Sequence, residues 1–169
     1  YRKSAVIQDL KDIRTAQIAF KEKNRVYAND FNSLLSFIKN DSLAVIKAVG
    51  ETPDSLTEEQ ALNEGIISRD TIFVPVYQTI YNTNYLNNRD NRFPFVLDKL
   101  PKVPFSDETY NIESGYIEKG KVVVQVFEVS TTFGTFLKGL DATNKGIDLD
   151  KFIKVGSMSD ASINGNWGE

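Results

Sequence analysis

The sequence contains no cysteine and no histidine, and these two absences exclude many kinds of functional site. Without cysteine, the chain can form no disulfide and has no thiol nucleophile. Without histidine, it lacks the Ser-His-Asp and Cys-His arrangements, the commonest general base, and the imidazole ligands of most transition-metal sites. We therefore expect no cofactor and no enzymatic activity, and the sequence favours a protein that binds or assembles.

The chain also lacks a strong net charge and long hydrophobic runs. Its net charge is −3, whereas a nucleic-acid-binding protein usually carries a strongly basic face, so no nucleic-acid partner is expected. No run of 18 apolar residues is present that could span a bilayer. Residues 1–25 hold seven basic against three acidic residues. This local excess is typical of a solvated helix face, although it would also suit an acidic surface or anionic headgroups.

What the sequence does contain is enough apolar material for one core. Of its 169 residues, 41% are hydrophobic, and these include eleven phenylalanines and seven tyrosines. A chain of this size buries enough surface to fold without disulfides or metals. We find no internal repeat and no linker, so residues 1–169 are expected to form a single soluble domain.

The first part of the chain predicts two helices. Apolar side chains recur at alternating spacings of three and four, which indicates one long helix over residues 3–24. The residues of this stripe are Val6, Leu10, Ile13 and Phe20, with the polar Gln17 at the same spacing. The same periodicity predicts a second helix over 31–40, with Asp30 or Asn29 capping its first turn.

The remainder of the chain predicts mostly strands. The clearest element is a β-hairpin of residues 109–118 and 121–130, joined at Lys119 and Gly120. Residues 72–79 are expected to be extended, 82–92 to form a mobile polar loop, and 93–105 to be kept extended by prolines. Shorter elements are expected at 43–49 (strand), 58–64 (helical turn), 133–140 and 147–155 (strand). The predicted fold class is therefore α+β, with a long N-terminal helix packed on an antiparallel sheet.

Two acidic patterns near the C-terminus offer weak candidate sites. Asp141, Thr143, Asp148 and Asp150 fall in a segment that partly matches a calcium-binding loop. Lys145 stands at a ligand position, however, and Phe152 stands where such a loop has its bidentate Glu, so a polar turn is preferred and no metal is expected. Asp148 and Asp150 would share one face of a strand, and they are the only candidates for a carboxylate-dependent enzyme.

Residues 10–20, followed by residues 24–28 and 31–34, resemble type IV pilins and the pseudopilins of secretion systems. Asn24, Tyr27, Phe31 and Leu34 occupy comparable positions, and Arg25 stands where glycine is frequent in the family. Residues 155–158 and 165–167 are similar to the end of membrane-anchored bacterial envelope proteins that have no assigned role.

The resemblance implies a function as well as a fold. It implies a non-catalytic protein on the periplasmic or extracellular side of a membrane, which acts through protein–protein contacts in an assembly or secretion apparatus. Its partners would be proteins, including other copies of the chain, with a hydrophobic anchor upstream of residue 1. Arg14, Gln17 and Lys21 on the first helix are the expected partner contacts.

Two alternatives remain open at this point. The chain could be an envelope or secreted ligand-binding module, whose ligand contacts Tyr77, Tyr81 and Tyr85. The second alternative is a carboxylate-dependent hydrolase that uses Asp148 and Asp150.

Overall fold

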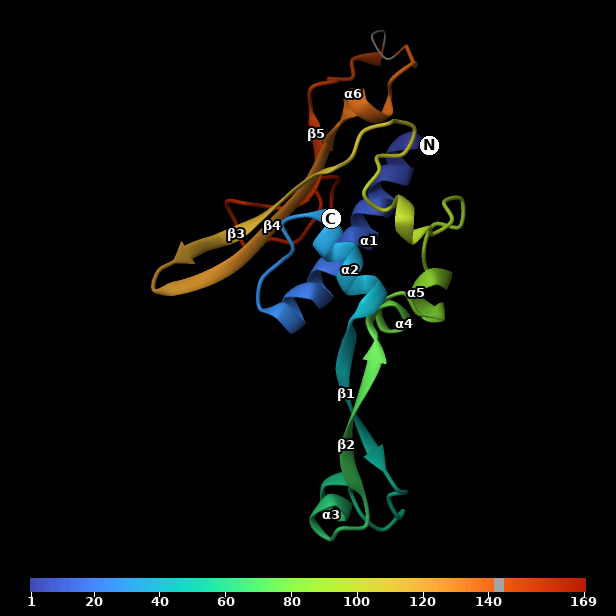
Figure 1. The fold of residues 1–169 in the computed structure, drawn as a ribbon, viewed down its shortest axis with the longest axis vertical. Coiled ribbons are helices and arrows are strands. Elements are labelled where there is room, and N and C mark those ends of the chain that lie inside the picture. The colour runs from blue at the N-terminus through green and yellow to red at the C-terminus, as the bar shows by residue number, and fades with distance from the viewer. Residues whose placement is uncertain (142–144) are drawn as a thin grey trace.

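The computed structural model of the chain describes residues 1–141 and 145–169 and has an α+β architecture, as predicted. A long helix, α1 (Arg2–Asn24), lies between a three-stranded antiparallel sheet and a group of short helices and turns (Figure 1). A separate two-stranded ribbon extends away from this body.

Helix α1 confirms the helix predicted over 3–24, and it buries two adjacent stripes. One stripe carries Val6, Leu10 and Ile13, and the other carries polar and small residues, including Gln8 and Asp12. No glycine or proline interrupts the helix. It ends at Arg25, whose backbone takes the left-handed conformation (φ 68°) and donates its N–H to the carbonyl of Lys21.

Helix α2 (Phe31–Asn40) also lies where the periodicity predicts it. The side chain of Asp30 caps the helix by accepting a hydrogen bond from the backbone N–H of Ser33 at 2.6 Å. Leu34, Phe37 and Ile38 are buried, so this helix adds its apolar face to the core beside α1.

The main sheet consists of β3 (Asn111–Lys119), β4 (Val122–Thr132) and β5 (Phe152–Gly156), with β4 in the middle. The predicted hairpin and its turn are therefore confirmed, whereas the last strand begins at residue 152 rather than 147. A short helix, α6 (Phe133–Phe136), follows β4. Phe127, Val129 and Val155 of the sheet share one hydrophobic core with α1.

The two-stranded ribbon is formed by β1 (Ser42–Val49) and β2 (Ser68–Pro75), and we call it the arm, together with α3 (Glu58–Asn63) at its tip. The predicted strand at 43–49 and helical turn at 58–64 are both confirmed. Thr57 and Gln60 form the capping box that starts α3, as their spacing indicates.

Three predictions for residues 72–105 are wrong in part. The extended segment ends at Pro75, because residues 76–80 form helix α4 (Val76–Ile80) and bury Val76. The expected mobile loop at 82–92 contains helix α5 (Thr83–Asn87), whose cap is Asn82. A 3-10 turn, η1 (Leu97–Lys99), interrupts the segment that prolines were expected to keep extended.

Candidate functional site

The second buried stripe of α1 holds an ion pair. The guanidinium of Arg89 donates to the carboxylate of Asp12 from two nitrogens, at 2.7 Å from Nη2 to Oδ2 and 3.0 Å from Nε to Oδ1. Their side chains are only 6% and 1% exposed. An arginine that binds a carboxylate with two nitrogens in this way is fixed in orientation as well as in place.

Further hydrogen bonds surround this pair and tie α1 to residues 81–93. The hydroxyl of Tyr85 donates to Oδ1 of Asp12 at 2.8 Å, and the hydroxyl of Tyr81 donates to its backbone carbonyl at 2.7 Å. Gln8 donates to Asp12 and accepts from the backbone N–H of Asp90. Burial and the Asp12 charge raise the pKa of Tyr85 well above its ordinary value, so its hydroxyl remains a donor.

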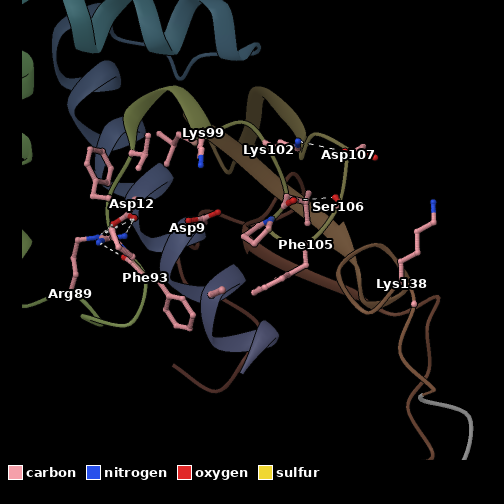
Figure 2. Close-up of a pocket in the computed structure, with 18 residues that line it drawn as sticks. Asp9, Asp12, Arg89, Phe93, Lys99, Lys102, Phe105, Ser106, Asp107 and Lys138 are labelled. Atoms are coloured by element: carbon pink, nitrogen blue, oxygen red, sulfur yellow. Dashed lines mark hydrogen bonds and ion pairs between the residues drawn. The ribbon is translucent and has the colours of Figure 1, made fainter.

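Beside this network lies a cavity of about 850 Å³ between α1 and residues 89–107 (Figure 2). Its walls are largely apolar, with Phe93, Phe95 and Phe105 as the aromatic contributors. Asp12 and Arg89 point toward each other at one side of the cavity, and Asp9 extends from α1 into it. A concave, mostly apolar space with few polar groups is typical of small-molecule sites.

Asp9 lines this cavity and has unused hydrogen-bonding capacity. Its Oδ2 accepts a hydrogen bond from the hydroxyl of Tyr110 at 3.2 Å, but no described residue donates to its Oδ1. Within the described part of the chain, no buried side-chain oxygen or nitrogen lacks a partner, so this Oδ1 must be accessible from the cavity. Burial, followed by the negative charge of Asp12, raises the pKa of Asp9 from 3.8 to about 7.

Cations and aromatic rings surround the mouth of the cavity. Lys99, Lys102 and Lys138 line it, and Lys102 lies 3.6 Å from the carboxylate of Asp107. The guanidinium of Arg2 lies 4.8 Å from the centre of the Phe105 ring. The aromatic wall of the cavity therefore already contacts cations of the protein itself.

The three predicted partner contacts on α1 differ in their surroundings. Gln17 is fully buried, and its side-chain amide is satisfied there because it both donates to and accepts from the backbone of Ala28 at 2.9 Å. Arg14 binds the carboxylate of Glu169, and the ammonium of Lys21 lies 5.3 Å from the ring centre of Tyr27. Arg14 and Lys21 thus reach the surface, whereas Gln17 does not.

The candidate calcium loop is only partly described, because Thr143 lies outside the described residues. Asp148 accepts a hydrogen bond from the backbone N–H of Asp150 at 3.0 Å, in a turn that precedes β5. The prediction that these two acids share a strand face is therefore wrong. Among residues 1–141 and 145–169, no group of three or more acidic side chains is placed to hold a metal ion.

The structure also relocates the tyrosines that were expected to contact a ligand. Tyr81 is buried and Tyr85 is bonded to Asp12, so only Tyr77 of the three is substantially exposed. Sequence reasoning missed Asp9, Asp12 and Arg89 entirely. The one available signal was the second stripe on α1, where Asp12 falls in helical register with Ala5, Gln8 and Ala16.

The fold and the site define an α+β protein with a buried ion pair, a ligand-sized cavity and an exposed arm. Comparison of the chain with protein-family models, with curated proteins and with solved structures finds no match. Within the described residues, each helix is too short or too polar to cross a bilayer.

Proposed function

We propose that the chain is a non-catalytic, pilin-like protein of the bacterial cell envelope that acts through protein–protein contacts in an assembly or secretion apparatus. The observation that carries this proposal is the arm, which leaves the body of the protein and exposes apolar side chains on both faces. The envelope location, with a membrane anchor outside residues 1–169, is supported by the resemblance of residues 10–34 to pilins.

The strand register shows how the apolar side chains of the arm are distributed. Ala44 is paired with Phe73 and Ile46 with Thr71, so Ile46 and Phe73 are diagonal neighbours on one face. These two side chains are 69% and 72% exposed. Val45 is paired with Ile72 on the opposite face, and both are also exposed.

An exposed two-stranded ribbon of this composition needs a partner for physical reasons. An isolated hairpin is only marginally stable in water, and both of its outer edges present unpaired backbone groups. Large apolar side chains on its faces gain free energy when another surface covers them. The arm therefore has the features of a docking element.

The charge of the arm's tip indicates what its partner carries. Residues 51–64 contain five carboxylates and neither lysine nor arginine. A basic surface would complement this tip, and residues 1–25 of a second copy offer one, with seven basic against three acidic residues. Arg14 and Lys21 belong to that surface, which supports self-association as one of the contacts.

Cysteine cross-linking tests the arm directly, because residues 1–169 contain no other thiol to compete. Phe73→Cys and Ile46→Cys place a single thiol on the arm, and Asp107→Cys places one on a fully exposed loop of the body as a control. We expect protein adducts in cells from the two arm variants and not from the control. Adducts of twice the chain's mass would identify self-association.

Two outcomes would contradict the proposal. If the arm variants give no adducts, or give the same adducts as Asp107→Cys, the arm is not a docking element. If the complete gene product fractionates entirely with soluble cytoplasmic protein, the envelope location is wrong.

The cavity beside Asp9 favours ligand binding as a second function.

A further inference from the structure

We propose that the cavity beside Asp9 binds a monovalent organic ammonium ion with an apolar body, whose ammonium group donates a hydrogen bond to Oδ1 of Asp9. This site is separate from the arm and does not depend on the function proposed for it. The cavity volume of about 850 Å³ lies within the usual range for small-molecule sites, roughly 300–1,000 Å³.

Asp9 supplies the reason for a cationic ligand. Arg89 lies close to Asp9, but its guanidinium is bound by Asp12, so the charge of that pair is already balanced. An ionised Asp9 is therefore a carboxylate in an apolar cavity without a counter-ion of its own, and burying such a charge is costly. An ammonium group at Oδ1 would balance the charge and use the free oxygen.

The aromatic walls favour the same class of ligand. A cation near the face of a phenylalanine ring is attracted by the ring's quadrupole. Each of the three phenylalanine rings of the wall already contacts a guanidinium of the protein. The distance to the ring centre is 5.1 Å from Arg92 to Phe93, 5.3 Å from Arg89 to Phe95 and 4.8 Å from Arg2 to Phe105. The rest of the wall, formed by residues such as Val96 and Val103, would contact the ligand's apolar body.

The lysines at the cavity mouth restrict the ligand to a single positive charge. Lys99 and Lys138 line the cavity and would repel a second ammonium group as it approached. Lys102 is paired with Asp107 and contributes less to this repulsion. A linear polyamine should therefore bind less tightly than a compound with one ammonium group.

The raised pKa of Asp9, about 7, adds a pH dependence that can be measured. An alkylammonium group stays charged up to about pH 10, so between pH 5 and 8 the ligand does not change. Below pH 7, Asp9 must lose a proton before it can bind the cation, so the affinity should fall by about tenfold per pH unit. The other charged or titratable groups that line the cavity or contact its wall are Tyr1, Arg2, Asp12, Arg89, Arg92, Lys99, Lys102, Asp107, Tyr110 and Lys138.

Calorimetric titration of the purified chain with matched probes tests the proposal. Phenethylammonium is the cationic probe, 2-phenylethanol its uncharged analogue, 3-phenylpropionate the anionic one, and spermidine the polyamine. At pH 8 we expect phenethylammonium to bind most tightly of the four, and at pH 5.5 to bind more than tenfold more weakly than at pH 8. Equal or tighter binding of phenylpropionate or spermidine, or no binding of phenethylammonium, would overturn the assignment.

Asp9→Asn should weaken phenethylammonium binding by about tenfold or more and remove its pH dependence, because a hydrogen bond to a charged group is lost. Asp54→Asn, which changes an exposed acidic residue at the tip of the arm, should keep both the affinity and its pH dependence. Thermal melting checks that each variant is folded. The comparison of the four probes on the unaltered chain remains decisive if Asp9→Asn does not fold. Unchanged affinity in folded Asp9→Asn would refute the proposal.

Discussion

The carboxylate of Asp12 lies on the first helix, and the guanidinium that neutralises it lies 77 residues further along the chain. Neither group has appreciable contact with water. Their mutual attraction offsets the cost of removing both charges from water, but it leaves each one dependent on the other. Tyr85 and Gln8 complete the hydrogen bonds of the carboxylate. The pair thus fixes the position of the segment that carries the cavity wall.

Removing one member of this pair should therefore be severe. Asp12→Ala leaves Arg89 buried without a counter-ion, and we expect a loss of about 3–5 kcal/mol in the free energy of unfolding. Replacing both charges with apolar residues of similar size, as in Asp12→Leu with Arg89→Met, should restore part of this loss. Urea unfolding measures the free energy of unfolding of the natural chain, of Asp12→Ala and of the double variant.

The matched control for that experiment is the more exposed pair of Arg14 and Glu169. Its side chains are 20% and 24% exposed, so water screens the interaction, and Arg14→Ala should cost no more than about 1 kcal/mol. A similar loss for Asp12→Ala and Arg14→Ala would show that burial does not set the strength of these pairs here.

A second prediction at this scale separates backbone strain from steric clash. Gly156 has a positive φ of 77°, and a Cβ added there would lie 2.2 Å from the backbone oxygen of Phe127. Gly65 has nearly the same φ, 74°, with no atom within 4 Å of the added Cβ. Gly65→Ala should cost about 1–2 kcal/mol from strain alone, and Gly156→Ala clearly more. Equal melting temperatures for the two variants would contradict this.

At the scale of elements, the local sequence pattern predicts the structure of some segments of the chain correctly and not that of others. Helices α1 and α2 and the β3–β4 hairpin follow from periodicity, capping and turn residues, because those signals lie within each element. Residues 82–92 look like a loop by composition. They are ordered by contacts with Asp12, which lies more than seventy residues away in the sequence.

The candidate site could not be predicted from the sequence for the same reason. Asp9 and Asp12 look like ordinary acids on a solvated helix, and nothing near them in the sequence indicates that Arg89 and Tyr110 will cover them. Gln17 was predicted to contact a partner, but its amide is bonded to the backbone of Ala28. Tertiary packing, rather than local propensity, decided each of these cases.

Hydrogen exchange should distinguish the arm from the main sheet. Strands β1 and β2 each have a single neighbour and little buried apolar surface, whereas β4 lies between two strands against the core. Amides of the arm should therefore exchange at least about tenfold faster than those of β4. Equal protection of the two regions in the isolated chain would show that the arm is stable without a partner.

For the molecule as a whole, α1 is the element that the other parts share. One stripe of the helix packs against the main sheet, and the other holds the ion pair and the wall of the cavity. The arm lies outside this core (Figure 1). Docking through the arm and binding in the cavity can therefore be tested by variants that do not disturb each other.

The position of Asp9 in the cavity wall, partly shielded from water, should also give the whole protein a pH-dependent stability. Its pKa is about 7 when folded and 3.8 in its ordinary state, so as the pH rises the unfolded chain releases this proton first. Asp9 thus lowers the free energy of unfolding progressively between about pH 4 and pH 7, and its effect is constant above pH 7. The pKa difference limits this effect to about 4 kcal/mol.

Asp9→Asn removes the titrating group while keeping the shape of the side chain. We expect this variant to gain stability relative to the natural chain as the pH rises from 4 to 7, with the gain reaching its maximum near pH 8. Urea unfolding at several pH values measures the difference, and Asp107→Asn, on an exposed loop, should show no such trend. The two chains share every other titrating group. A difference in their free energy of unfolding that stays constant with pH would therefore mean that Asp9 has the same pKa in the folded protein as in water. The cavity would then be far wetter than its apolar walls indicate.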